Sequence, residues 1–319
     1  MTGTASGRLP PAVFLMGPTA AGKTDLAVAL VEHLPLDIIS VDSALVYRGM
    51  DIGTAKPDAA TLARAPHRLV DICEPEEIYS AARFRADALR EMAVITAAGR
   101  VPLLVGGTML YFRALQRGLA ELPAADRAVR ERLQAELASQ GLAALHRRLA
   151  AVDPAAASRI HVNDPQRTLR ALEVWELTGQ PLSALQAAQA TVALPYRVLK
   201  LVWAPGERRV LGERIERRFV AMLEQGLLDE VRGLLARPGM RPDTPALRAV
   251  GYRQAVAHLS GEYDAASLRE RAVAATRQLA KRQLTWLRAE TGARWFDADA
   301  PNAAERVLKA VGTHLNSAK

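Results

Sequence analysis

One short stretch near the N-terminus has the residue types and the spacing that bind phosphate. An apolar run at residues 13–16 is followed by the pattern G-x-x-x-x-G-K-T, formed by Gly17, Gly22, Lys23 and Thr24. The glycines let the backbone turn tightly, so that successive N–H groups and the start of the next helix point at one anion. Lys23 then reaches the terminal phosphates, and the Thr24 hydroxyl suits a Mg²⁺ ion. The stretch predicts a pocket for a diphosphate or a triphosphate.

A carboxylate follows the second candidate strand. Asp42 comes directly after the apolar residues 37–41. The carboxyl ends of parallel strands face the ligand crevice, so Asp42 is expected near the phosphate loop. There it could hold Mg²⁺ or accept a proton from an incoming nucleophile. The alternative is an ordinary turn or N-cap aspartate.

Three further clusters are candidates for binding. Residues 106–108 form a second glycine turn after the apolar residues 101–105. It either lets a ligand or another chain approach the backbone closely or is simply a tight turn between a strand and a helix. Gln166, Arg167 and Arg170 begin a predicted helix, where they would contact phosphate or bases, or form a solvated face. Residues 248–254 offer two arginines and a tyrosine around a glycine, which suits either a nucleic-acid strand or a helix start with surface arginines.

The elements that would position these residues alternate between strand and helix. This alternation predicts an α/β fold in which a parallel sheet is covered on both faces, with a P-loop after the first strand. The candidate strands lie at residues 13–16, 37–41, 69–72, 101–105, 197–203 and 294–296.

One section breaks the alternation and is predicted to be a helical insertion. Between residues 118 and 194 the pattern shows helices at 126–139, 142–151 and 165–178 and no convincing strand. The last helix has Asp164 as a plausible N-cap, Pro165 at its first position and Gly179 at its end. We therefore expect a catalytic core of residues 1–118 and 195–319, with a basic, helical C-terminal part, and an inserted helical domain of residues 119–194.

The composition favours a globular protein with a polyanionic partner. Half of the 319 residues are hydrophobic, and 42 Lys plus Arg against 34 Asp plus Glu give a net charge of +8. Such an excess is typical of nucleic-acid-binding proteins, although a merely basic enzyme would also show it. The single cysteine, Cys73, excludes a disulfide framework and a Cys-based zinc site. Residues 1–11 lack a signal peptide pattern and no stretch is long enough to span a membrane, so we expect a cytoplasmic protein.

Taken together, the motifs resemble one family, the tRNA dimethylallyltransferases, also called tRNA isopentenyltransferases, of the bacterial type. They follow that family's order over most of the chain: the phosphate loop at 17–24, D-S-A-L-V-Y-R at 42–48, G-T-A-K-P at 53–57, G-G-T-M-L-Y at 106–111, D-P-Q-R at 164–167, R-A-L-E at 170–173, G-Y-R-Q at 251–254 and T-R-Q-L-A-K-R-Q-L-T-W at 276–286.

The resemblance implies a prenyl transfer to RNA. Dimethylallyl diphosphate would donate its prenyl group to the exocyclic N6 of adenosine 37 in tRNAs that read U-initial codons, and pyrophosphate would leave with the help of Mg²⁺. The phosphate loop, of a kind that also binds nucleotides such as ATP, would then hold the leaving pyrophosphate. The target base must leave its stack to reach the pocket. The insertion would clasp the anticodon stem-loop, and the enzyme is expected to be a monomer.

The resemblance also implies site residues by position. The catalytic group comprises Asp42, Lys23, Thr24 (also the metal ligand) and Arg217, the last as a diphosphate ligand. The donor site comprises Gly17, Pro18, Thr19, Ala20, Ala21, Gly22, Lys23 and Thr24. The tRNA contacts comprise Asp42, Ser43, Ala44, Leu45, Thr108, Arg130, Gln166, Arg167, Thr168, Leu169, Arg170, Arg248, Gly251, Tyr252, Arg253 and Lys281. Many members have Gln at the position of Leu45 and a small residue at that of Met109, both near the expected base pocket.

Three other functions stay open on the residues themselves. A small-molecule kinase would use the same loop for ATP, but it gives no reason for the long helical insertion or the basic C-terminal third. A nucleotide-gated RNA-binding protein would keep the arginines and not need Asp42. A prenyltransferase acting on free AMP would need no large basic clasp.

Overall fold

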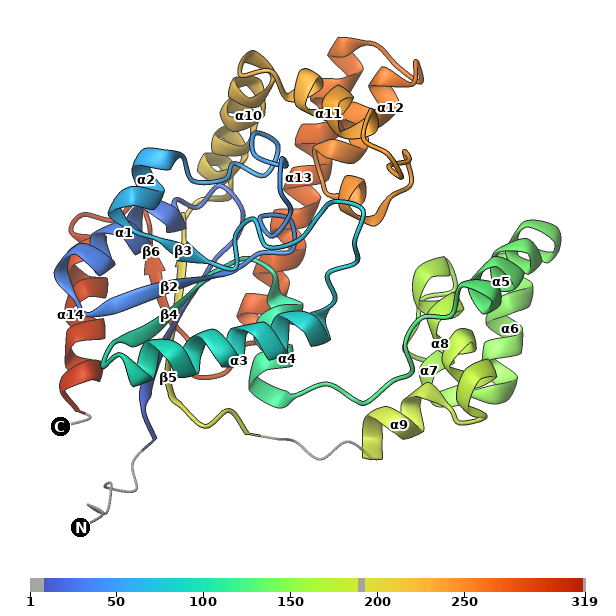
Figure 1. Ribbon diagram of the computed structural model, residues 1–319, viewed down its shortest axis with the longest axis horizontal. Helices are drawn as coiled ribbons and strands as arrows, with labels where there is room; N and C mark the ends of the chain where they lie inside the picture. Colours follow the sequence, from blue (N-terminus) through green and yellow to red (C-terminus); the bar gives the residue numbers. More distant parts are fainter. Residues whose placement is uncertain (1–8, 189–192, 318–319) are drawn as a thin grey trace. The chain divides into compact units, whose positions relative to one another are not determined.

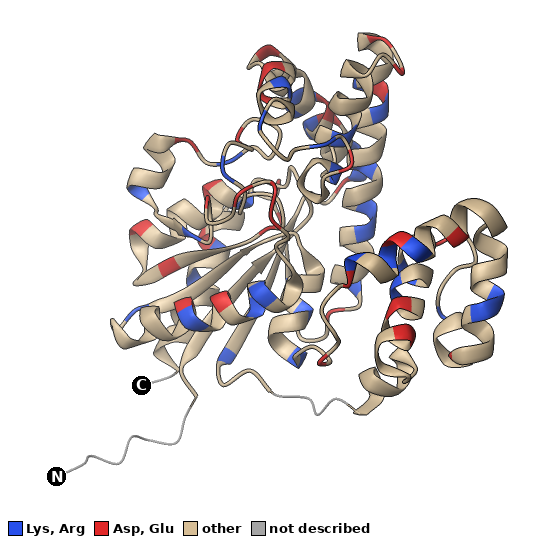
Figure 2. Ribbon diagram, turned by 45° about the vertical axis from the view of Figure 1, so that its right-hand side comes forward, with Lys and Arg blue, Asp and Glu red and all other residues tan. Residues whose placement is uncertain are grey.

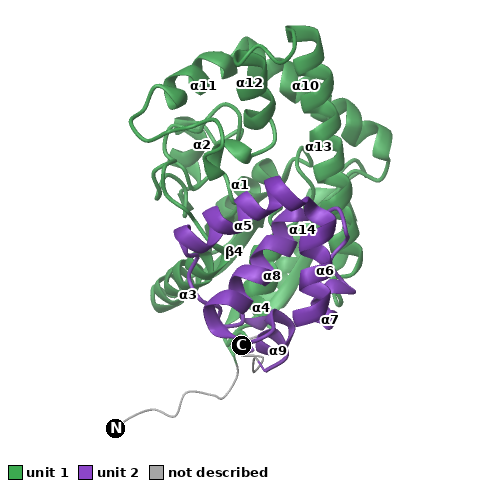
Figure 3. Cartoon of the chain, turned by 90° about the vertical axis from the view of Figure 1, so that its right-hand side faces the viewer, with its two compact units in different colours: residues 1–116, 194–319 green, residues 117–193 purple. Residues whose placement is uncertain are grey.

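The computed structural model describes residues 9–188 and 193–317, and the chain divides into two compact units. Unit 1 comprises residues 1–116 and 194–319, and unit 2 comprises residues 117–193 (Figure 3). Most of the stretch for which no signal peptide is expected, residues 1–11, lies outside the described part. Each unit has its own hydrophobic core and is described separately below.

Unit 1 is built on a six-stranded sheet with the strand order β3-β2-β4-β1-β5-β6 (Figure 1). Every strand pair is parallel, which confirms the predicted α/β class. The strands are β1 (Pro11–Met16), β2 (Leu36–Val41), β3 (His67–Arg68), β4 (Val101–Gly106), β5 (Arg197–Ala204) and β6 (Arg294–Asp297).

Helices cover both faces of this sheet because successive side chains of each strand point to opposite faces. On one face Leu15 and Ile38 pack with α1 and α14, and on the other Phe14 and Ile39 pack with α3, α4, α10 and α13. The helices of this unit are α1 (Lys23–His33), α2 (Ala59–Arg64), α3 (Ala81–Ala97), α4 (Met109–Arg117), α10 (Arg208–Glu224), α11 (Leu227–Leu235), α12 (Tyr252–Leu259), α13 (Ala265–Arg288) and α14 (Ala303–Asn316), with a short 3₁₀ turn at Pro245–Arg248.

The strand predicted at residues 69–72 is wrong. The edge strand β3 consists of two residues and ends at Arg68, and both Leu69 and Asp71 have positive φ angles of 61° and 54°. Such angles take the chain out of the extended conformation. The N–H of Ile72 instead donates to the carbonyl of Val46 at 2.9 Å, so this segment supports the loop that follows β2.

Unit 2 is helical, and its described residues contain no strand. Its helices are α5 (Arg127–Gln140), α6 (Leu142–Val152), α7 (Pro154–Ala157), α8 (Pro165–Thr178) and α9 (Leu182–Ala188), and they enclose a small core that includes Leu133, Leu149 and Leu172. Helix α8 has the predicted bounds, because the Asp164 side chain accepts from the N–H of Arg167 and Gly179 closes the helix in the left-handed conformation. None of the helices in the described ranges is long and apolar enough to cross a membrane.

Candidate active site

The phosphate loop lies between β1 and α1, at the carboxyl edge of the sheet. Gly17 must be glycine, because a Cβ there would lie 2.2 Å from the carbonyl oxygen of Trp203 in β5. The Lys23 ammonium donates to the carbonyl of Pro18 at 2.7 Å and so closes the loop. Thr24, partly exposed, follows in the first turn of α1. The loop thus has the form that binds a phosphate group at a helix N-terminus.

Lys23 occupies an environment in which its positive charge is costly. Burial lowers its pKa to about 8; the Asp42 carboxylate opposes this shift, and the nearby Arg218 guanidinium adds to it. The ammonium is therefore charged below about pH 8 and becomes neutral as the pH rises above that value. An anion bound by the loop would stabilise the charged form.

Asp42 follows β2 and serves its own turn as well as facing the site. Its Oδ1 accepts from the N–H of Ala44 at 2.8 Å and of Leu45 at 3.3 Å. This turn role, one of the two interpretations of the sequence, fixes the orientation of the carboxylate. Within the described residues both of its hydrogen bonds use Oδ1, so Oδ2 is available to a substrate. The negative charge of Asp42 raises the pKa values of Lys23 and Arg218 against the larger lowering by burial. The pKa of the Tyr111 hydroxyl is raised mainly by burial, and the Asp42 charge adds to that shift.

The second glycine turn joins the ends of β2 and β4 to the phosphate loop. The N–H of Gly17 donates to the carbonyl of Gly106 at 3.3 Å, and the N–H of Thr108 donates to the carbonyl of Val41 at 3.2 Å. The Thr108 hydroxyl in turn accepts from the N–H of Ser43 at 3.1 Å. Thr108 therefore lies beside the Asp42 turn and supports it.

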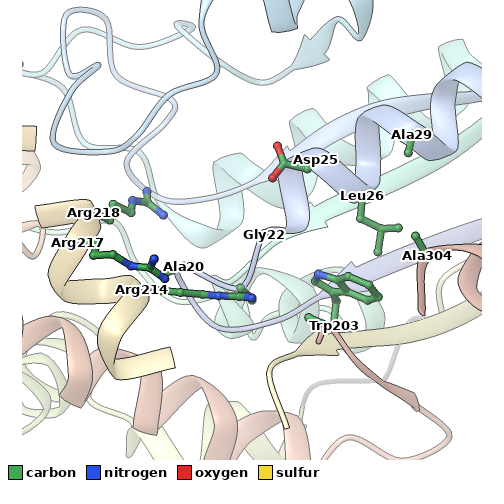
Figure 4. A pocket seen from close by; sticks show the side chains of 12 residues that line it. Ala20, Gly22, Asp25, Leu26, Ala29, Trp203, Arg214, Arg217, Arg218 and Ala304 are labelled. Atoms are coloured by element: carbon green, nitrogen blue, oxygen red, sulfur yellow. The ribbon is translucent and has the colours of Figure 1, made fainter. Parts of the chain in front are cut away.

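Three arginines of α10 reach toward the phosphate loop (Figure 4). Arg217 is exposed, Arg214 pairs with Asp299, and Arg218 is held by a bond to the carbonyl of Thr54 at 3.0 Å. Burial lowers the pKa of Arg218, and the Asp42 charge partly restores it. A pocket of about 600 Å³ lies here; its lining comprises Ala20, Ala21, Gly22, Asp25, Leu26, Ala29, Trp203, Arg214, Arg217, Arg218, Ala298 and Ala304. Arg218, which we did not predict, thus joins Arg217 as a candidate diphosphate ligand.

The loop that carries Thr54 is fixed by one carboxylate. Glu230 of α11 accepts from the N–H groups of Asp51 at 2.9 Å, Ile52 at 2.7 Å and Gly53 at 3.2 Å. The Tyr252 hydroxyl donates to the same carboxylate at 2.5 Å. The sequence gives no local signal for Glu230, because its partners lie far away along the chain.

Some expected tRNA contacts of unit 1 are buried. Tyr252 is fully buried and Gly251 is buried beside it, so the structure does not present the tyrosine ring to a base, and both tRNA contacts stay predictions. The ring belongs to the core, where its hydroxyl needs an internal acceptor. Arg248, Arg253 and Lys281 have exposed side chains and stay predictions.

The expected tRNA contacts of unit 2 differ in exposure, and some of them are paired with other side chains. Gln166 and Arg167 are exposed in the first turn of α8, and Leu169 is partly buried. The Thr168 side chain is fully buried, and its tRNA contact stays a prediction. The buried carboxylate of Glu173 binds two predicted contacts, Arg130 at 2.8 Å and Arg170 at 2.6 Å. Arg130 of α5 therefore ties its helix to α8, whereas Arg170 pairs with Glu173 within α8 and donates to the carbonyl of Pro123 at 2.8 Å.

Comparison with known proteins gives a single family. A family model described as IPP transferase matches residues 45–290. The tRNA dimethylallyltransferase of Thioalkalivibrio sulfidiphilus is 61% identical over 97% of both chains, and that of Thiobacillus denitrificans is 62% identical over 97% of this chain and 98% of its own.

Solved structures agree with this comparison. The full-length tRNA isopentenylpyrophosphate transferase of Bacillus halodurans is 37% identical, with a TM-score of 0.70 over 96% of this chain and 97% of its own. A eukaryotic dimethylallyltransferase acting on tRNA is 23% identical, with a TM-score of 0.81 over 97% of this chain and 80% of its own, and that likeness concerns the fold.

The neighbouring arginines Arg217 and Arg218 provide a matched pair of variants. We expect Arg218→Ala to weaken pyrophosphate binding on the order of 10-fold or more, because it removes a desolvated charge beside the loop. Arg217→Ala, at an exposed position, is expected to weaken it by less than about 3-fold. Isothermal titration with pyrophosphate and Mg²⁺ measures both, with melting temperatures as a check on folding. A larger loss for Arg217→Ala would contradict this ranking.

Proposed function

The chain belongs to the IPP transferase family of tRNA dimethylallyltransferases, and from this premise we propose which atoms it joins and which residues act. Dimethylallyl diphosphate donates its prenyl group to N6 of adenosine 37 in tRNAs that read U-initial codons. The C–O bond of the donor breaks, the N6–C bond forms, a proton leaves N6, and pyrophosphate departs. The observation that carries the proposal is that the charges of Lys23, Arg218 and Asp42 lie close enough at the phosphate loop to interact with one another.

We assign to the phosphate loop the stabilisation of the negative charge that develops on the diphosphate. Negative charge grows on the diphosphate as the C–O bond breaks, and donors that are already in place stabilise it at no cost of reorganisation. The N–H groups of residues 20–24, the Lys23 ammonium and the Arg218 guanidinium are such donors. Their partial burial makes each of these interactions stronger than it would be in water.

Asp42 is the residue that we propose for the acceptor. The exocyclic amine of adenine is a poor nucleophile, because its lone pair is delocalised into the ring. A fixed carboxylate can accept a hydrogen bond from N6, orient the amine and take its proton. The turn bonds at Oδ1 support this role, since they hold the carboxylate and leave Oδ2 without a hydrogen bond among the described residues.

A magnesium ion fits this site as a partner of the diphosphate. Thr24 offers a hydroxyl in the first turn of α1, and no group of three or more His, Cys, Asp or Glu side chains is gathered for a metal within the described residues. Mg²⁺ commonly takes one or two protein oxygens and completes its shell with phosphate and water. Bound by Thr24 and the donor, it would neutralise charge on the diphosphate oxygens.

The RNA partner accounts for the exposed basic residues. Lysines and arginines recur along α13 (Figure 2), and Lys281 is one of them. We assign tRNA contacts to exposed groups of each unit, namely Ser43, Gln166, Arg167, Arg248, Arg253 and Lys281, and to the partly buried Thr108, Ala44 and Leu45 beside Asp42. Arg side chains suit phosphates, and these contacts make binding depend on salt. We further expect a monomer that works in the cytoplasm.

Transfer to a defined base tests the proposal. The protein is mixed with labelled dimethylallyl diphosphate, Mg²⁺ and an unmodified tRNA that reads U-initial codons, and the digested RNA is analysed by mass spectrometry. We expect prenylated adenosine from this tRNA and none from a transcript in which adenosine 37 is guanosine. Equal labelling of both transcripts would contradict the assignment of the acceptor.

Replacement of the proposed base is a second test. Asp42→Asn keeps the size and one acceptor oxygen of the side chain but removes the carboxylate that takes the proton. We expect kcat to fall by roughly 10²–10⁴ while the affinity for tRNA stays close to that of the unaltered protein. Single-turnover kinetics and filter binding measure the two quantities. Unchanged kcat would exclude Asp42 as the base.

A further inference from the structure

The phosphate loop is tied to a residue from the far end of the chain. Gln283 of α13 accepts with Oε1 from the N–H of Thr19 at 2.9 Å, and its Nε2 donates to the carbonyl of Gly107 at 2.9 Å. These partners fix the orientation of the amide, since an N–H group requires the oxygen and a carbonyl requires the nitrogen. One side chain therefore joins the loop before α1 to the glycine turn after β4.

This connection leaves no room for a side chain at position 107 unless Gln283 moves. A Cβ at position 107 would lie 2.4 Å from Nε2 of Gln283 and 3.1 Å from the carbonyl oxygen of Gly17. A side chain at position 107 would thus displace the amide of Gln283 that bonds the loop. From the sequence, the second glycine turn could either allow a ligand to approach or be an ordinary tight turn. In the structure, it is the Gln283 side chain of this protein that approaches its backbone.

The turn leads on to the acceptor side of the site. Thr108, the residue after Gly107, accepts from the N–H of Ser43, which adjoins Asp42. The chain of contacts therefore runs from Thr19 in the donor loop through Gln283 and the turn to the Asp42 segment. A displacement of either group by about 1 Å can cost on the order of 100-fold in rate, because the reacting atoms must meet in line.

We propose that Gln283 is a positioning residue that sets the phosphate loop against the Asp42 turn and so fixes the donor relative to the acceptor base. It touches neither substrate; it acts through the backbone of Thr19 and Gly107. The inference rests on the proposed function, because it assigns the donor to the loop and the acceptor to Asp42. It differs from a tRNA contact, the role that we assign to Lys281 two residues earlier on the same helix.

The test replaces the amide without shortening the side chain much. Gln283→Met removes both hydrogen bonds, and Gln283→Asn keeps an amide that is too short to reach both partners. Gln278→Met is the matched control, because Gln278 is exposed on the same helix. For each variant we would measure the melting temperature, the affinity for pyrophosphate with Mg²⁺, the affinity for tRNA, and kcat and KM for the donor.

We expect Gln283→Met to weaken pyrophosphate binding by about 10-fold, as the loss of two neutral hydrogen bonds implies. Its kcat should fall by roughly 10- to 100-fold even at saturating donor, with Gln283→Asn in between. The affinity for tRNA should stay within about 2-fold, because the exposed basic residues that supply it are unaltered. Gln278→Met should match the unaltered protein throughout.

Two results would overturn the inference. One is a Gln283→Met variant that folds and equals the Gln278→Met control in pyrophosphate affinity and kcat. The other is a loss confined to tRNA affinity, which would make Gln283 an RNA contact. A failure of the unaltered protein to bind pyrophosphate or to transfer the prenyl group would instead refute the proposed function, and the inference with it.

Discussion

The partly buried ammonium of Lys23 is the charge on which the site depends. Removal from water lowers its pKa to about 8, and the Asp42 carboxylate offsets part of that cost. Arg218 adds a second desolvated cation, held by the carbonyl of Thr54. Two cations and one carboxylate leave an excess of positive charge that a diphosphate would balance. The sheet, the Asp51–Gly53 clamp by Glu230 and the Gln283 bridge all serve to keep these groups in place.

Local pattern predicted those parts of the molecule whose causes are local. The phosphate loop, five of the six strands and helix α8 follow from short motifs, apolar runs and caps such as Asp164. The segment at residues 69–72 failed because its apolar residues support a neighbouring loop rather than the sheet. The burial of Tyr252 could not be predicted, because it depends on residues distant in sequence, such as Glu230, whose carboxylate accepts from the tyrosine hydroxyl. Gln283 meets Thr19 across 264 residues, and no sequence period marks such a contact.

Positive charge in this protein is divided between structure and function. Arg130 and Arg170 carry charges that look suited to RNA, yet both bind the buried carboxylate of Glu173, and Arg130 thereby links α5 to α8. Removing that carboxylate would leave both guanidinium groups without their carboxylate partner, and we expect it to destabilise unit 2. Arg167, Arg253 and Lys281 are exposed and free to change partners at low cost. The count of 42 Lys plus Arg therefore overstates the number of basic side chains available to a polyanion.

The stoichiometry of the leaving group tests the central claim, that the phosphate loop holds a diphosphate which departs during transfer. The measurement follows pyrophosphate release and prenylated adenosine together in single-turnover reactions that contain no nucleoside triphosphate. One pyrophosphate for each modified adenosine, without any added triphosphate, is the predicted result. A requirement for ATP, or the release of inorganic phosphate in place of pyrophosphate, would contradict it, because the loop would then be working as that of an ordinary nucleotide-hydrolysing enzyme.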